Sequence, residues 1–235
     1  MKERIVELYD LMYKKLGPQG WWPIYDLEQK KCVYIPQRYK KNTKEMIFEI
    51  SIGAILTQNV SWNNVEKAIG NLKSQGYLSP KCIYEMDMDK LGDLIKSTGY
   101  YRQKAQRLKE LSLFFIKNPI SELKKKRIDK LRELLLSIKG VGKETADSII
   151  LYAFQKPIFV IDSYTKRVYS RFIGDKRCYE YDELRKIFES SLTRDFRIYS
   201  EFHALIVEVA KRYCFKNNPD CKKCFLSHKC FQKER

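Results

Sequence analysis

The hydrophobic residues of this 235-residue chain recur three and four positions apart, the spacing that gives a helix one buried face. Strand-like alternation is confined to the short stretch 157–160. With 10 glycines and 7 prolines, the chain has few turn residues for a many-stranded β protein. The pattern therefore predicts an all-α fold. The predicted helices cover 1–16, 46–56, 65–75, 79–86, 89–97, 103–117, 129–137, 143–154, 182–191 and 199–213.

Two segments depart from this simple amphipathic pattern. Residues 46–56 are almost continuously apolar, which predicts a helix buried on all sides at the centre of the fold. Residues 19–41 lack helical spacing and contain Trp21-Trp22-Pro23, so we expect a loop there.

The charge balance narrows the choice of partner. Lys and Arg number 46 against 29 acidic residues, a net charge of +17, which favours a polyanion such as nucleic acid or an acidic membrane. No apolar stretch is long enough for a membrane span or a signal peptide. We therefore expect an intracellular protein, in cytoplasm or nucleoid, with no membrane partner. The 2 histidines leave little room for a histidine-based site.

A glycine turn joins two predicted helices at Gly140-Val141-Gly142. Glycines permit positive φ and close approach of another backbone. The amides of residues 141–144, at the start of a helix, would then reach a phosphate, as in a helix-hairpin-helix clamp on DNA. The alternative is an ordinary helical corner in which glycine ends the first helix.

Asp162 directly follows the apolar triplet Phe159-Val160-Ile161. It can be the N-cap of a following helix, accepting hydrogen bonds from first-turn amides. It can also be a partly desolvated carboxylate that stabilises positive charge at a reacting centre. The residue alone leaves both roles open.

Four cysteines crowd the C-terminal tail with the spacing C-x6-C-x2-C-x5-C, and this spacing is typical of an iron–sulfur cluster. A zinc site, in which His228 replaces one thiolate, is the alternative. Cys32, Cys82 and Cys178 stand apart and receive no role. The predicted ligands are Cys214, Cys221, Cys224 and Cys230.

The hairpin, the aspartate and the cysteine tail, in this order and spacing, resemble the endonuclease III superfamily of helix-hairpin-helix DNA glycosylases. The resemblance implies two helical domains with double-stranded DNA bound across a cleft. One domain would be a six-helix block at 43–153, the other 1–42 plus 154–235. It also implies that Asp162 is catalytic and that the tail holds a [4Fe–4S] cluster.

The resemblance assigns DNA contacts as well. Gln58 matches the residue that fills the gap left by a flipped-out nucleotide; the alternative is a polar residue at a helix end. The tail lysines are expected to face DNA, the alternative being a solvated surface. The expected backbone contacts are Gly140, Val141, Gly142, Lys143, Glu144, Lys216, Lys222 and Lys223.

The sequence departs from the family pattern at Glu144. Members that also cleave the strand have a lysine nucleophile here, two residues after the second hairpin glycine. A carboxylate cannot form a Schiff base, and Lys143 is rotated about 100° around the helix. We therefore expect a monofunctional glycosylase that uses water, with weak or absent lyase activity.

Trp21-Trp22-Pro23 resembles the branch of this superfamily that excises 3-methyladenine and related alkylated purines. There the aromatics, with a phenylalanine matching Phe48, enclose the flipped base. The alternatives are a hydrophobic plug for the tryptophans and a core position for Phe48.

The prediction is a monomeric alkylpurine DNA glycosylase of base excision repair that acts on duplex DNA containing a damaged base. One rival is an endonuclease III-type specificity for oxidised pyrimidines, uracil or mismatched bases. The other is a non-catalytic protein that binds damaged DNA, and only Asp162 argues against it.

Overall fold

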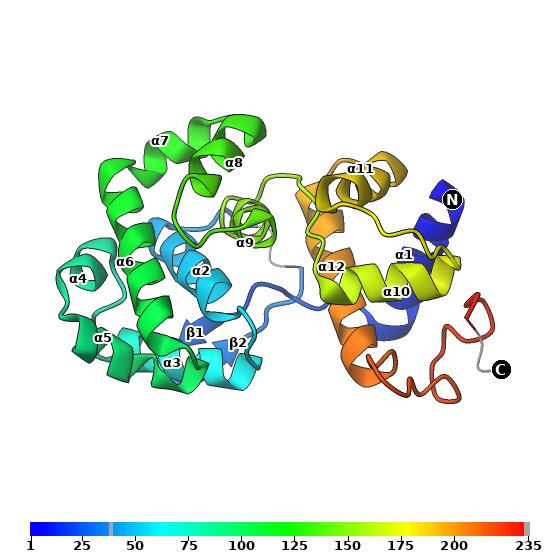
Figure 1. Cartoon of the computed structure of the whole chain (residues 1–235), viewed down its shortest axis with the longest axis horizontal. Helices are drawn as coiled ribbons and strands as arrows, with labels where there is room; N and C mark the ends of the chain where they lie inside the picture. The colour runs from blue at the N-terminus through cyan, green and yellow to red at the C-terminus, as the bar shows by residue number, and fades with distance from the viewer. Residues whose placement is uncertain (38–39, 233–235) are drawn as a thin grey trace. The chain divides into compact units, whose positions relative to one another are not determined.

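The computed structural model describes residues 1–37 and 40–232. Within these residues the chain is helical apart from one short two-stranded sheet, so the all-α prediction is confirmed (Figure 1). No helix among them is long and apolar enough to cross a membrane.

The chain forms two compact units. Unit 1 contains Met1–Trp21 and the C-terminal part from Pro157 onward, and unit 2 contains Trp22–Ile35 and Lys40–Lys156. The sequence prediction assigned all of 1–42 to the same domain as the C-terminal part. In the structure, residues 22–35, 40–42 and 154–156 group with unit 2.

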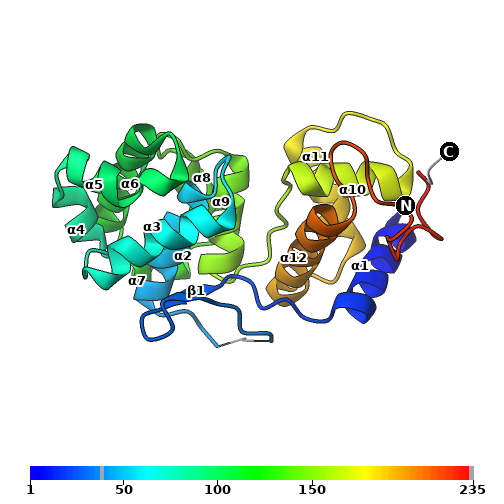
Figure 2. The same ribbon diagram turned by 90° about the horizontal axis from the view of Figure 1, so that it is seen from below.

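Unit 2 is built around α2 (Lys44–Leu56), which is buried from Ile47 to Leu56 as its continuous apolar run predicts (Figure 2). Its N-cap Thr43 accepts a hydrogen bond from the Met46 amide. The surrounding helices include α7, whose single buried residue, Leu123, gave too weak a periodicity to be predicted. The other unit 2 helices are α3 (Trp62–Ser74), α4 (Pro80–Glu85), α5 (Met88–Leu94), η1 (Lys96–Thr98), α6 (Tyr101–Lys117), α7 (Ile120–Lys125), α8 (Ile128–Leu136) and α9 (Lys143–Ser148).

The predicted loop at 19–41 contains the antiparallel strands β1 (Ile24–Asp26) and β2 (Lys31–Val33). Two buried or half-buried carboxylates hold this hairpin to unit 2. Glu49 on α2 accepts from the Tyr25 amide at 2.6 Å, and Glu66 on α3 accepts from the Cys32 amide at 2.6 Å. Each strand has only three residues, too few to show an alternation of buried and exposed positions, so local spacing did not predict the sheet.

The glycine hairpin joins α8 to α9, which continues into a π-helical turn, η2 (Ile149–Ala153). Arg132 on α8 donates two hydrogen bonds to Asp147 on α9, at 2.6 and 3.2 Å. The Asp147 side chain is fully buried, so this pair fixes the hairpin helices against each other.

Unit 1 packs α1 (Lys2–Leu16), α10 (Ser163–Ile173), α11 (Tyr181–Ser191) and α12 (Phe196–Arg212) around aromatic side chains. Phe159 stacks on Phe188, and both lie against Phe202. Helix α10 was not in the predicted set, although its buried residues Thr165, Val168, Tyr169 and Phe172 recur three and four positions apart.

Candidate functional site

The hairpin turn in unit 2 is closed by a hydrogen bond from the Val141 amide to the Ile138 carbonyl, at 3.0 Å. Gly140 has φ 89°, and a Cβ there would lie 2.6 Å from Cγ of Arg107. Gly142 has φ −89°, and a Cβ there would meet no heavy atom within 4 Å. The first glycine is therefore required by the fold, whereas the second leaves space beside the backbone.

Helix α9 begins at Lys143 with Gly142 as its N-cap, a residue with no side chain to fill the helix end. Lys143 and Glu144 are exposed in its first turn. The amide of Val141 is used within the turn, so three of the four predicted phosphate-facing amides, those of residues 142–144, belong to the helix start.

Gln58 lies against this hairpin. Its Nε2 donates to Oγ1 of Thr145 at 2.9 Å and to the Gly140 carbonyl at 3.4 Å, and its Oε1 accepts from Arg107. The structure thus brings two of the sequence-predicted elements, Gln58 and the hairpin, into direct contact within unit 2.

Arg107 was not identified from the sequence. It comes from α6, touches both Gln58 and the hairpin at Gly140, and adds a guanidinium to the predicted DNA-contact region. In sequence it is one basic residue among 46, so no local signal distinguishes it.

Asp162 is the N-cap of α10, and its Oδ1 accepts from the Thr165 amide at 2.6 Å. Its Oδ2 lies 3.5 Å from Nε2 of His203 on α12. The cap alternative is therefore realised in the structure, but it uses only one carboxylate oxygen. The side chain keeps 12% of its surface exposed, and its second oxygen has His203 as its neighbour.

The charge on Asp162 is maintained by its neighbours. Burial by itself would raise the pKa of this carboxyl, but hydrogen bonding and charge from His203, with the Thr165 amide, hold the pKa below its usual value. His203 is 5% exposed. The small histidine count did not suggest a partner for Asp162, and only the packing of α12 reveals one.

The two tryptophans belong to different units, Trp21 to unit 1 and Trp22 to unit 2. The Trp21 ring meets His203 edge-on at a centroid distance of 6.0 Å, and Nζ of Lys211 lies 5.8 Å from the same ring. Trp22 packs against Trp62 and Tyr152 within unit 2.

Phe48 is 1% exposed in α2 and meets Phe115 edge-on at 5.7 Å. This is the geometry of the core alternative. A role for Phe48 in base stacking stays a prediction.

The four tail cysteines line one cavity in unit 1, together with apolar residues that include Val168, Phe172 and Leu226. Burial raises the pKa of Cys224 and Cys230, and the nearby Cys214 and Cys221 sulfurs raise both further. His228 is exposed and is not among the residues lining this cavity. Within the described chain, no three Cys, His, Asp or Glu side chains converge closely enough to hold one metal ion.

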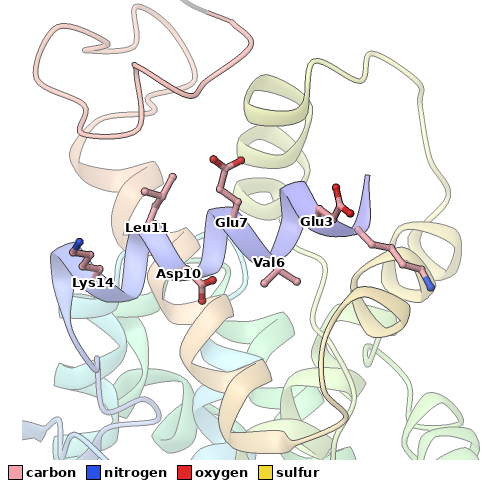
Figure 3. Close-up of a pocket in the computed structure, with 7 residues that line it drawn as sticks. Glu3, Val6, Glu7, Asp10, Leu11 and Lys14 are labelled. Atoms are coloured by element: carbon pink, nitrogen blue, oxygen red, sulfur yellow. The ribbon is translucent and has the colours of Figure 1, made fainter.

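Arginines attach this tail to the helices of unit 1. Arg171 on α10 donates to Sγ of Cys214 at 3.3 Å, and its carbonyl faces Sγ of Cys230 at 3.3 Å. Arg4 on α1 donates to the Lys229 carbonyl, and Glu7, which Figure 3 shows extending from α1, pairs with the Lys229 side chain at 3.3 Å. Lys216, Lys222 and Lys223 are exposed on the tail, as DNA contact or a solvated surface would require.

Comparison with known proteins gives a consistent result. Residues 52–194 match the HhH-GPD superfamily of base excision DNA repair proteins. A candidate DNA repair glycosylase of Methanocaldococcus jannaschii is 42% identical over 98% of this chain and 97% of its own length. Endonuclease III of Thermotoga maritima is 31% identical over 83% of this chain and 88% of its own length.

Two solved structures resemble the chain closely in fold. Endonuclease III trapped as a covalent intermediate with DNA has a TM-score of 0.76 at 22% identity, covering 98% of this chain and 96% of that one. A 3-methyladenine DNA glycosylase of H. pylori bound to 1,N6-ethenoadenine has a TM-score of 0.67 at 29% identity, covering 90% of this chain and 97% of that one.

Proposed function

Because the chain belongs to the HhH-GPD superfamily of base excision DNA repair proteins, and is a DNA glycosylase of that family, we propose that it excises alkylated purines by hydrolysis without cleaving the strand. The observation that carries the hydrolytic part is Asp162, a carboxylate kept charged and partly exposed in unit 1. The alkylpurine specificity rests on Trp21 and Trp22, and the absence of strand cleavage rests on Glu144.

DNA binding is supported by charge and by the hairpin. A net charge of +17 favours phosphate neutralisation, and the start of α9 directs its positive dipole end outward past a glycine. Binding to duplex DNA is therefore expected to weaken steeply as salt rises. Gln58 and Arg107 lie beside the hairpin. They would contact the DNA duplex at the position from which a nucleotide has flipped out.

The reaction proposed for Asp162 is hydrolysis of the N-glycosidic bond. The C1′–N bond breaks with its electron pair going to the base, and the sugar develops oxocarbenium character that the Asp162 charge stabilises. Water then bonds to C1′ and loses a proton, leaving free base and an abasic site. A cationic alkylpurine departs as a neutral base, so this site needs no separate acid.

Strand cleavage through a lysine would need an amine at the position of Glu144, which is exposed in the first turn of α9. Its carboxylate cannot form an imine with the sugar aldehyde. This supports a monofunctional enzyme.

The preference for alkylpurines rests on Trp21 and Trp22 as stacking partners. Methylation at N3 or N7 makes the base cationic, and attraction of a cation to a tryptophan face contributes about 0.5–2 kcal/mol. The 29% identity to a glycosylase bound to an ethenoadenine supports this preference. Identity with endonuclease III of T. maritima supports the rival specificity to a similar degree.

The tail cysteines fit an iron–sulfur cluster. A single zinc needs all its sulfurs about 2.3 Å from one point, whereas a [4Fe–4S] cluster offers each thiolate its own iron. The cavity lined by Cys214, Cys221, Cys224 and Cys230 offers four sulfur donors, the set that a [4Fe–4S] cluster takes. The cluster would neutralise the mutually repelling thiolates and stabilise the tail.

Anaerobic purification tests the cofactor. The protein is expected to be yellow-brown with about four irons and four sulfides per chain. Cys221→Ser should lose colour and iron, whereas Cys178→Ser, at an exposed position outside the tail, should keep both. A colourless protein that contains one zinc contradicts the cluster.

A panel of duplexes with one modified base each tests the activity under single-turnover conditions. We expect release of 3-methyladenine and 7-methylguanine ahead of thymine glycol, uracil or mismatched adenine. Trp21→Ala should slow alkylpurine release far more than it weakens binding to an abasic duplex. Efficient release of thymine glycol with none of 3-methyladenine would assign the chain to the endonuclease III specificity.

A further inference from the structure

A buried carboxylate on α12 fixes the backbone just before Trp21. Glu201 is 6% exposed and accepts hydrogen bonds from the amides of Gln19, at 2.8 Å, and Gly20, at 3.4 Å. These residues are far apart in sequence but lie in unit 1 together.

This arrangement is costly to build, which suggests a purpose beyond packing. Burial raises the pKa of Glu201, and its two amide partners offset only part of that effect. Gly20 has φ 72° and is itself buried, so the chain turns sharply at the residue that precedes Trp21. An apolar side chain would fill the same space but leave two amides without this acceptor.

The turn delivers the Trp21 ring to a defined place on α12. The ring lies edge-on to His203, whose Nε2 is 3.5 Å from Oδ2 of Asp162. Lys211, eight positions after His203 and so on the same helix face, lies 5.8 Å from the Trp21 ring. Glu201 thus fixes the aromatic ring next to the residue that faces the proposed catalytic carboxylate.

Unit 2 shows a different solution for the residues after Trp22. Glu49 accepts from the Tyr25 amide but is also neutralised by Lys73 at 2.6 Å, which in turn donates to the Tyr25 carbonyl. That carboxylate therefore belongs to an ion pair holding the sheet. Among the described residues, Glu201 has backbone amides as its hydrogen-bond partners.

We propose that Glu201 is a positioning residue for Trp21, and that it sets base selectivity by fixing this ring relative to His203 and Asp162. The proposal rests on the role of Trp21 as a stacking partner. It assigns to Glu201 no contact with the reacting atoms.

A double-mutant cycle tests the proposal. Trp21→Ala, Glu201→Leu and the double variant are compared for single-turnover release of whichever base the wild type removes. Misplacement of a positioning group by about 1 Å can lower a rate up to about 100-fold. We expect Glu201→Leu to slow release about as much as Trp21→Ala, and the double variant to be no slower than Trp21→Ala. Additive losses would overturn the proposal.

Fluorine NMR of protein labelled with 5-fluorotryptophan reads the ring position without activity. The three tryptophans give three signals, and Trp21→Phe assigns one. Glu201→Leu should shift or broaden that signal and spare those of Trp22 and Trp62. Glu201→Gln, which keeps one acceptor oxygen, should shift it less. Glu208→Gln, on the same helix and paired with Arg212, should shift none.

The two experiments separate the proposals. If the wild type releases no alkylpurine but the Trp21 signal still changes in the Glu201 variants, the substrate assignment is wrong. The role of Glu201 in fixing the Trp21 ring is then still supported. If the Trp21 signal is unchanged in folded Glu201→Leu and Glu201→Gln, Glu201 does not position the Trp21 ring, whatever the substrate is.

Discussion

Two helix starts, one in each unit, solve the same electrostatic problem in opposite ways. In unit 2, α9 begins at Gly142, where no side chain can fill the positive end of the helix. In unit 1, α10 begins at Asp162, whose carboxylate accepts from the Thr165 amide. The first helix has no side chain at its N-cap, and the second supplies its own anion.

The buried aspartates near these helix starts differ in the same sense. Asp147 in α9 is fully buried and receives two hydrogen bonds from Arg132, so its charge is neutralised within the fold. Asp162 has an amide and His203 as partners and keeps an exposed edge. The comparison distinguishes a fully buried carboxylate paired with an arginine from a partly exposed one that caps a helix.

The largest effect is expected from removing the charge of Asp162. Asp162→Asn should lower single-turnover excision by at least about a thousand-fold, because the amide cannot stabilise the oxocarbenium charge. The thermal midpoint should change little, because asparagine is an equally good N-cap. Asp162→Ala should lose activity and about 1 kcal/mol of stability as well. Retained activity in Asp162→Asn would mean that the residue is only a cap.

At Asp147 we expect the opposite result, a large loss of stability caused by removing the charge. Asp147→Asn removes the charge that pairs with the largely buried Arg132 and should cost about 3–5 kcal/mol in the free energy of unfolding, measured by chemical denaturation. Asp129→Asn is the control, because its pair with Arg127 is exposed and should cost less than about 1 kcal/mol. If both variants lose a similarly small free energy of unfolding, the Arg132–Asp147 pair does not stabilise the hairpin.

The two hairpin glycines should separate binding from folding. Gly142→Ala meets no atom within 4 Å and has an ordinary φ, so it should fold normally. Its methyl group would stand where a phosphate approaches the helix start, and DNA affinity should fall about tenfold, near 1.4 kcal/mol. Gly140→Ala should instead lower the thermal midpoint, because its φ is 89° and its Cβ meets Arg107. Titration of an abasic duplex and thermal melting measure the two effects, and unchanged affinity in Gly142→Ala would argue against phosphate binding there.

The Glu144 position predicts an absence of covalent chemistry. Borohydride should trap no enzyme–DNA adduct on a damaged duplex, because the hairpin helix offers a carboxylate where an amine would be needed. Glu144→Lys tests whether an amine at this position can reach the sugar. It should give a weak band of trapped enzyme–DNA adduct on denaturing gels. Strong trapping by the wild type, abolished in Lys143→Ala, would assign the nucleophile to Lys143.

The smallest expected effect is the change in excision rate as the pH is lowered. The pKa of Asp162 is held below its ordinary value, so the carboxylate stays ionised as pH falls through the range where a normal aspartate gains a proton. Its contribution to stability is likewise present above the ordinary pKa and lost only below the lowered one. Excision of a cationic purine should therefore stay constant from about pH 7 down to about pH 4, near the ordinary pKa of an aspartate. A tenfold loss of excision rate per pH unit in this range would show that the pKa of Asp162 is raised rather than lowered.

Periodicity and motif spacing together predicted much of this protein. Residues 46–56 are apolar enough to require burial on every side, and α2 occupies that position. The glycine hairpin and the cysteine spacing are local patterns, and each folds from residues adjacent in the chain, so the sequence alone indicated a helical glycosylase with a cysteine tail.

Only the tertiary structure decided which side chains from distant segments meet. His203 faces Asp162, Arg107 joins Gln58 to the hairpin, and Glu201 fixes the turn before Trp21. It also paired the strands of the 24–33 hairpin and buried Phe48 against Phe115. Local spacing reports which face of a helix is buried but not what that face meets, because the partner is chosen by packing across the whole unit.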